Sequence, residues 1–266
     1  MRRNKEQSPP LAAFTTGAAI GVLGGLVGLG GAEFRLPLLI GLFRFGALEA
    51  VVLNKAMSLV VVATALPFRA GSVPLASIVD RIDVLLTLLA GSVIGAWFGA
   101  STATRVRSQT LYRTIAILLL GIAAILLWGH HSESQAVSEI NGVSRTVLGV
   151  IAGVAIGAIA ALLGVAGGEL LIPTIVLLFG VDLKLAGSLS LAVSLPTMIV
   201  GFCRYSQDQS FSVIKKQGRF IVIMAAGSLL GTFLGGRLLG IVPITILLPL
   251  LAAILVISAV KIWRHA

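Results

Sequence analysis

Four ionisable side chains stand within otherwise apolar segments: Glu33, Arg35, Lys55 and Glu169. A charge surrounded by apolar residues is costly to bury, so each of the four is a candidate for a functional role. The guanidinium of Arg35 can offer a planar fork to two oxygens of an oxyanion. The ammonium of Lys55 lies far from any charge-rich loop and can also meet an anion. These residue types predict a binding site for a small anion.

Each of these residues also has a structural interpretation. Lys55 could pair with Glu33, and Arg35 could pair with Glu33 or extend its charged end to an interface. Glu33 and Glu169 should repel an anion unless they are protonated, which suggests that a carboxyl group takes up a proton together with the substrate. Alternatively, both carboxylates stabilise the N-terminus of a short helix. The sequence leaves these alternatives open.

Four uncharged polar residues accompany them: Asn54, Ser58, Ser190 and Ser194. They form two pairs with a spacing of four residues, which puts each pair on one side of its helix. These side chains could bind the oxygens of an oxyanion, or they could hydrogen-bond to neighbouring helices.

The two pairs match because the chain contains an internal repeat. A shift of 136 positions aligns the first half with the second half without a gap. The same shift places Glu33 on Glu169. Further matches are Gly28 with Gly164, Gly31 with Gly167, Pro37 with Pro173, Gly91 with Gly227, Gly95 with Gly231 and Gly99 with Gly235. One half is therefore a copy of the other.

The composition is that of an all-α integral membrane protein. Hydrophobic residues make up 57% of the chain and charged residues 11%, and the mean hydropathy is +1.05. Apolar stretches of bilayer-spanning length recur, and helices satisfy their own backbone in hydrocarbon. We expect 8–10 transmembrane segments. The predicted helices cover residues 11–30, 33–45, 48–68, 82–101 and 110–128 in the first half, and 147–166, 169–181, 184–204, 218–237 and 243–263 in the second.

The second helix of each half is too short to span a bilayer comfortably, follows a glycine-rich break and carries an early proline, so it reads as a broken or re-entrant helix near the midplane. The remaining three crossings give each half an odd number, which inverts the second repeat relative to the first. The predicted organisation is a cytoplasmic tail (1–10), a first transmembrane repeat (11–128), an extracytoplasmic linker (129–146) and a second transmembrane repeat (147–264).

Glycines precede both short helices: Gly30 and Gly31 in the first half, Gly167 and Gly168 in the second. A helix that begins there leaves several backbone N–H groups unpaired and carries the positive end of its dipole. Two such ends that converge near the midplane would form an anion cradle. The alternative is that these glycines only allow close helix packing.

Basic residues set the expected orientation. Most of them fall on one side of a ten-helix arrangement, and lysine and arginine are retained on the cytoplasmic side. Both termini are therefore predicted to be cytoplasmic, in a multi-pass protein of the inner (plasma) membrane. Topology and attraction to anionic membrane lipid explain the net charge of +10 without a nucleic-acid partner. The expected partners are a small anionic solute and lipid, and a homodimer through glycine-lined faces is left undecided.

An enzymatic function is not expected. The three histidines, His130, His131 and His265, stand at predicted helix ends or loops, so they cannot form an intramembrane metal site or a Ser–His dyad. The sequence has no ATPase-type phosphate-binding loop. We therefore expect no cofactor and no metal.

The duplicated glycine motifs carry a resemblance. Gly28-Leu29-Gly30-Gly31-Ala32 with Pro37, its echo at 164–168 with Pro173, and the segments 54–59 and 187–190 resemble the TauE/SafE sulfite exporter family over residues 11–263. That family usually has a third consecutive glycine where Ala32 stands and apolar residues where Glu33 and Arg35 stand.

The resemblance implies movement of sulfite, sulfonates or related organic anions across a membrane. Together with the residues above, it predicts a secondary transporter, an exporter or permease, that works by alternating access and is coupled to protons. The alternatives are a passive anion channel and a membrane scaffold that transports nothing.

Overall fold

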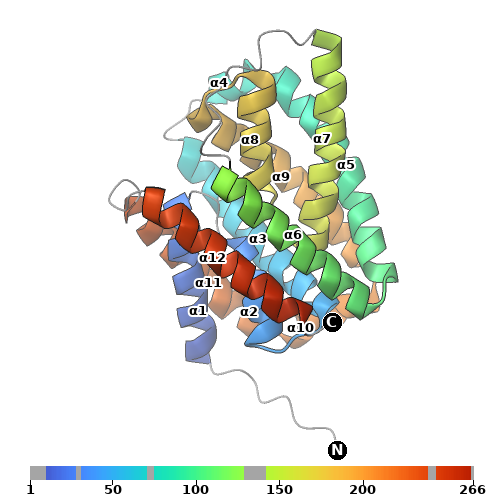
Figure 1. Ribbon diagram of the computed structural model, residues 1–266, viewed down its shortest axis with the longest axis vertical. Coiled ribbons are helices and arrows are strands. Elements are labelled where there is room, and N and C mark those ends of the chain that lie inside the picture. The colour runs from blue at the N-terminus through green and yellow to red at the C-terminus, as the bar shows by residue number, and fades with distance from the viewer. Residues whose placement is uncertain (1–9, 28–30, 71–74, 129–141, 239–243, 265–266) are drawn as a thin grey trace, which may run out of the picture.

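The computed structural model describes residues 10–27, 31–70, 75–128, 142–238 and 244–264. These residues form helices joined by short turns, and no strand occurs among them. Figure 1 shows the helices as one elongated bundle. The helices are α1 (Pro10–Val27), α2 (Ala32–Gly41), α3 (Ala47–Ala70), α4 (Leu75–Val79), α5 (Ile82–Arg105), α6 (Ser108–Trp128), α7 (Gly142–Leu163), α8 (Gly168–Phe179), α9 (Leu183–Tyr205), η1 (Gln209–Phe211), α10 (Ser212–Lys216), α11 (Gly218–Leu238) and α12 (Ile244–Trp263).

The ten helices predicted from the sequence are all present. The prediction missed α4, α10 and η1, which are too short to show an apolar period. Helix α7 also begins at Gly142, five residues before the predicted start, because its polar first turns continue the helix beyond the apolar stretch. The histidines near residue 130 and at 265 lie outside the described residues.

Five of the described helices are long and apolar enough to cross a membrane. Their apolar spans are Ala47–Thr64 in α3, Ile82–Arg105 in α5, Gly142–Leu163 in α7, Leu185–Tyr205 in α9 and Gly218–Gly235 in α11. Further apolar helices are shorter, and α8 is one of them. The protein is therefore a multi-pass membrane protein.

The halves exchange their packing partners. Helix α1 packs on α11, and α7 packs in the corresponding way on α5. A Cβ added at Gly91 in α5 would overlap the carbonyl oxygen of Val150, and a Cβ at Gly227 in α11 would overlap that of Phe14, the residue that the repeat aligns with Val150. Small residues thus bring the backbones of each helix pair close together.

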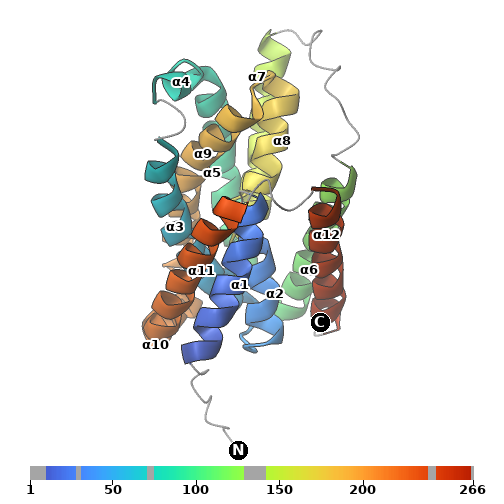
Figure 2. The ribbon, with the colours of Figure 1, turned by 90° about the vertical axis from the view of Figure 1, so that its left-hand side faces the viewer.

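Helices α3 and α9, which correspond to each other in the repeat, pack against each other and carry most of the polar residues singled out above. Helices α6 and α12 form another corresponding pair. Figure 2 shows this second pair on one side of the bundle, with α1 and α2 between it and α11. The polar residues of α3 and α9 therefore lie in the interior, where neighbouring helices shield them.

Candidate functional site

Each short helix starts at a glycine with a left-handed backbone. Gly31 precedes α2 with φ 71°, and Gly167 precedes α8 with φ 83°. Residues with a side chain rarely adopt this conformation, so the glycine sets the direction in which each helix leaves the break. The helical hydrogen bonds begin at matching positions, from the Arg35 amide to the Gly31 carbonyl and from the Leu171 amide to the Gly167 carbonyl. The two helix starts therefore share a left-handed glycine and the same first α-helical hydrogen bond.

A proline follows each start by six residues. Pro37 lies inside α2 and Pro173 lies inside α8. Proline has no N–H, so the carbonyl one turn earlier loses its helical donor. These carbonyls belong to Glu33 and Glu169. Each of these carbonyls therefore lacks its α-helical donor and stands beside the carboxyl group of the same residue.

The side chains of Glu33 and Glu169 face each other. Glu33 is 2% exposed and Glu169 is 7% exposed, and their carboxyl groups interact directly. Neither oxygen of Glu33 reaches the geometry of a full hydrogen bond with any described residue. Both residues occupy the first turn of their helix, as the helix-stabilising interpretation requires. Their mutual contact also brings the starts of the two short helices together.

The charge of Arg35 interacts with that of Glu33. Its side chain is fully buried, so it does not extend to an interface. The repeat aligns Arg35 with Leu171, and the second short helix therefore has no cation at the corresponding position. The short helix that carries Glu33 thus has a cation two residues further on, and the short helix that carries Glu169 has leucine there.

Asn54 connects the two breaks. Its side-chain amide donates hydrogen bonds to the Ala32 carbonyl, 3.0 Å away at the start of α2, and to the Leu163 carbonyl, 3.1 Å away at the end of α7. The Leu163 carbonyl is orphaned by the end of α7 and would otherwise lack this donor, whereas the Ala32 bond ties α3 to the start of α2. The side-chain oxygen of Asn54 has no partner among the described residues. The residue has a clear structural role and keeps one acceptor unused.

Lys55 is fully buried, and its ammonium donates to the Val165 carbonyl at 3.5 Å in the break between α7 and α8. Its side chain passes Gly201 of α9, where an added Cβ would lie 3.2 Å from Cε and 3.3 Å from Nζ. Within the described part of the chain it pairs with no carboxylate, so the expected alternative of a pair with Glu33 is not observed. A long contact to one neutral carbonyl leaves this ammonium able to accept an anion.

The predicted serines differ in their surroundings. Ser194 donates to the Ala166 carbonyl at 2.8 Å, and Ser190 donates to the Gly187 carbonyl of its own helix at 2.9 Å. Ser58 is buried, and its hydroxyl has no partner among the described residues. Gly168 is the first residue of α8, whereas Gly30 lies outside the described residues.

Sequence reasoning missed two buried hydroxyls beside this site. Ser92 of α5 and Thr197 of α9 share a hydrogen bond of 2.7 Å. Thr197 stands seven residues after Ser190, on the same side of α9, so the helical period could have found it. Ser92 matches Ser228 in the repeat, and both are buried. The polar lining is therefore wider than predicted.

The site offers hydrogen-bond donors and charges, but no set of metal ligands. No group of three histidine, cysteine, aspartate or glutamate residues occurs among the described residues. The chemistry that the site can perform is recognition of an anion by ammonium, guanidinium, hydroxyl and backbone N–H groups, with a carboxyl pair that can hold a proton.

Comparison with known proteins gives one match. The family model described as sulfite exporter TauE/SafE matches residues 13–262. No curated protein and no solved structure matches the chain. The match covers nearly the whole chain and includes both short helices and every described site residue. The chain therefore belongs to the TauE/SafE sulfite exporter family, a family of membrane transporters.

Proposed function

We propose that this protein is a secondary transporter of small sulfur-containing or organic anions, such as sulfite or sulfonates. We also propose that transport of the anion is coupled to protons. The observation that carries the proposal is the buried ammonium of Lys55, which has one long hydrogen bond to a neutral carbonyl and no carboxylate partner among the described residues. Burial of a cation without a compensating anion costs on the order of several kcal/mol per ion. A substrate anion beside Lys55 would supply that compensation locally, although it would not leave the net charge of the interior unchanged.

The other substrate ligands are the groups that surround Lys55 along α3, α9 and the two breaks. The Ser58 hydroxyl has no other described partner, and the first turns of α2 and α8 carry backbone N–H groups outside the helical hydrogen bonds. Such groups bind oxyanions at helix N-termini. Arg35, Asn54, Ser190, Ser194, Gly30, Gly31, Gly167 and Gly168 complete the proposed set.

Charge balance supports proton coupling. Among the described residues, the buried acids are Glu33 and Glu169 and the buried bases are Arg35 and Lys55. Their charges cancel when all four are ionised, so a bound anion would add an uncompensated negative charge to an interior of low dielectric constant. Protonation of one carboxyl group restores the balance. The expected stoichiometry is one proton for each negative charge on the substrate.

The proposed mechanism is alternating access between two inverted repeats. The reciprocal packing of α1 on α11 and of α7 on α5 supports a two-fold relation between the halves. In Figure 2, α1 begins near the lower end of the bundle and α7 begins at the upper end, as an inverted relation requires. Substrate sites of such transporters lie where the broken helices of the repeats meet.

We further propose the inner (plasma) membrane as the location, with both termini in the cytoplasm. The end of α12 lies toward the same end of the bundle as the start of α1 in Figure 2. Lys215, Lys216, Arg105 and Lys261 stand at helix ends or in short helices, where retention of positive charge would hold them in the cytoplasm.

Radiolabelled sulfite counterflow in proteoliposomes tests the function. Excess unlabelled sulfite inside the vesicles should accelerate entry of label, and sulfate, thiosulfate, sulfoacetate or a simple carboxylate should compete according to affinity. A carrier shows this acceleration because the loaded site returns faster than the empty site. Fast flux without counterflow would indicate a channel instead, and no flux with any of these anions would overturn the proposal.

Lys55→Gln and Arg35→Gln test the site within the same assay. Each variant removes a charge but keeps a polar side chain, and each should abolish counterflow while the protein still purifies as a single species. Lys216→Gln is the control, because Lys216 is exposed in α10. Wild-type rates in both site variants would show that the anion binds elsewhere.

A further inference from the structure

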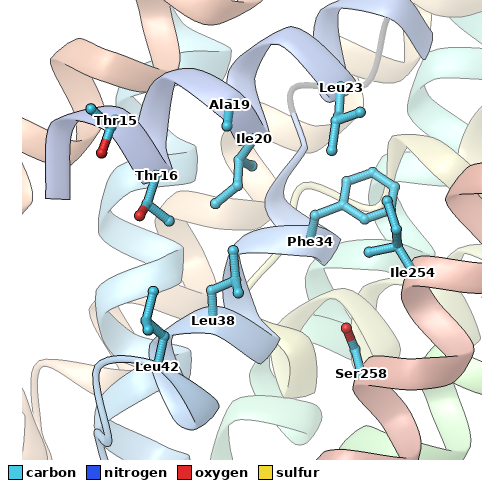
Figure 3. Close-up of a pocket in the computed structure, with 10 residues that line it drawn as sticks. All are labelled: Thr15, Thr16, Ala19, Ile20, Leu23, Phe34, Leu38, Leu42, Ile254 and Ser258. Atoms are coloured by element: carbon cyan, nitrogen blue, oxygen red, sulfur yellow. The ribbon is translucent and has the colours of Figure 1, made fainter. Parts of the chain in front are cut away.

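A separate groove lies between α1, α2 and α12 (Figure 3). Its volume is about 350 Å³, which is within the range of small-molecule sites. Phe34 and Leu38 of α2 form one wall, Ala19 and Leu23 of α1 form the second, and Ile254 and Ser258 of α12 face them. None of its lining residues carries a charge. The groove therefore suits an apolar chain rather than an anionic substrate.

A lysine stands at one end of this groove. The side chain of Lys261 lies over Gly41, where an added Cβ would be 3.3 Å from Cε and 3.5 Å from Nζ. Leu42, the next residue, lines the groove. Lys261 also follows Ser258 by three residues, about one turn along α12. Its ammonium is thus at the point where an apolar chain in the groove would reach the membrane surface.

A second cation and a tryptophan stand at this end of the helix pair formed by α6 and α12. The guanidinium of Arg113 in α6 lies 5.9 Å from the ring centroid of Trp263 at the end of α12. Tryptophan is enriched at the level of lipid headgroups, and basic residues between transmembrane helices bind anionic headgroups. This end of α12 therefore combines the two features of a membrane–water interface.

From the apolar groove and the lysine at its end, we propose that the groove holds one acyl chain of an anionic phospholipid, whose phosphate binds Lys261. The same helix α2 carries Glu33 on its buried side and Phe34 on the groove side. A lipid in the groove consequently supports the helix that bears one carboxyl group of the candidate site. The site depends only on the membrane location of the protein and not on its substrate.

The test measures retained lipid by native mass spectrometry after purification from membranes that contain phosphatidylglycerol and phosphatidylcholine. The wild type should retain phosphatidylglycerol in preference. Lys261→Gln should reduce that preference by about fivefold, because one basic residue near the surface contributes about 1 kcal/mol. Lys216→Gln, which removes an exposed cation elsewhere, should leave the preference unchanged. An equal loss in both variants would show diffuse attraction and overturn the proposed headgroup site.

A bulky residue in the groove tests the acyl chain. Ser258→Phe should remove retained lipid of both headgroups, whereas Val260→Phe, on the exposed side of the same helix, should not. Ala19→Leu fills the groove from α1 and should act as Ser258→Phe does, which separates blocking of the groove from damage to α12. Unchanged retention in both groove variants of correctly folded protein would overturn the proposal.

Discussion

The carboxyl groups of Glu33 and Glu169 interact with each other, although one belongs to each half of the chain. The internal repeat aligns the two residues, so their contact lies where the halves meet. Two ionised carboxylates in direct contact would repel each other strongly in an interior of low dielectric constant. A proton that enters or leaves this pair changes both the local charge and the force between the two short helices. The pair is therefore suited to link protonation to movement of one half against the other.

Glu169→Gln should separate exchange from proton coupling. Glutamine at position 169 takes up no proton, and with Glu33 ionised the variant leaves one excess positive charge that compensates a bound anion, so binding no longer requires a proton. Sulfite counterflow should continue, while uptake driven by an imposed pH gradient should fall to the rate without a gradient. Parallel measurements of counterflow and gradient-driven uptake in proteoliposomes check this. The exposed Asp83 supplies the control Asp83→Asn. Full pH-driven uptake in Glu169→Gln would show that the pair does not carry the proton.

Gly95→Ala should destabilise the protein. Its Cβ would overlap the Val154 carbonyl oxygen in α7, and overpacking of this kind costs roughly 1–3 kcal/mol. For a chain of this size, the melting temperature should fall on the order of 5 °C. Gly231→Ala makes the corresponding overlap with Ala18 in the other helix pair and should have the same effect.

Gly121→Ala is the control for these glycine variants, because a Cβ at Gly121 in α6 meets no atom within 4 Å. It should leave the melting temperature unchanged or raise it slightly, since alanine favours helix. Thermal melts, with size-exclusion chromatography as the readout, compare Gly95→Ala, Gly231→Ala and Gly121→Ala. Equal melting temperatures in Gly95→Ala and Gly121→Ala would contradict the close approach of α5 and α7.

The positions of the main helices could be predicted because apolar length and glycine breaks act locally. The starts of α2 and α8 could be predicted from consecutive glycines followed by an early proline, whereas a single glycine such as Gly95 stays inside its helix. Helices α4 and α10 were missed because five residues are too few for an apolar period. Their formation depends on the tertiary structure around them.

The composition of the candidate site was less predictable than its location. Burial of Arg35 and Lys55 followed from apolar neighbours in the sequence, but their partners did not. The contact of Lys55 with the Val165 carbonyl and the bridge made by Asn54 join segments more than a hundred residues apart. Such contacts arise from packing of the two halves, which the repeat suggests only in outline. Thr197 could have been found from the helical period of α9.

Asn54→Ala should lower stability more than Ser190→Ala, because the repeat aligns Asn54 with Ser190 but only Asn54 bridges two helices. The variant removes the side-chain amide that donates to two carbonyls, those of Ala32 and Leu163. An unsatisfied buried group costs roughly 1–3 kcal/mol. Ser190→Ala is the matched comparison, because the Ser190 hydroxyl bonds only a carbonyl of its own helix. Thermal melts of both variants check this, and a larger loss in Ser190→Ala would contradict a bridging role for Asn54.

Gly201→Ala should weaken anion binding without a comparable loss of stability. The added Cβ would press on Cε and Nζ of Lys55, which form the far end of a flexible side chain and can move away. The ammonium would then leave its position beside the α7–α8 break, so the KM for sulfite should rise while the maximal counterflow rate and the melting temperature change little. Gly218→Ala, whose Cβ meets no atom within 4 Å, should leave all three quantities unchanged. A fall in melting temperature as large as that of Gly95→Ala, with KM unaltered, would assign Gly201 to packing alone and separate it from the position of Lys55.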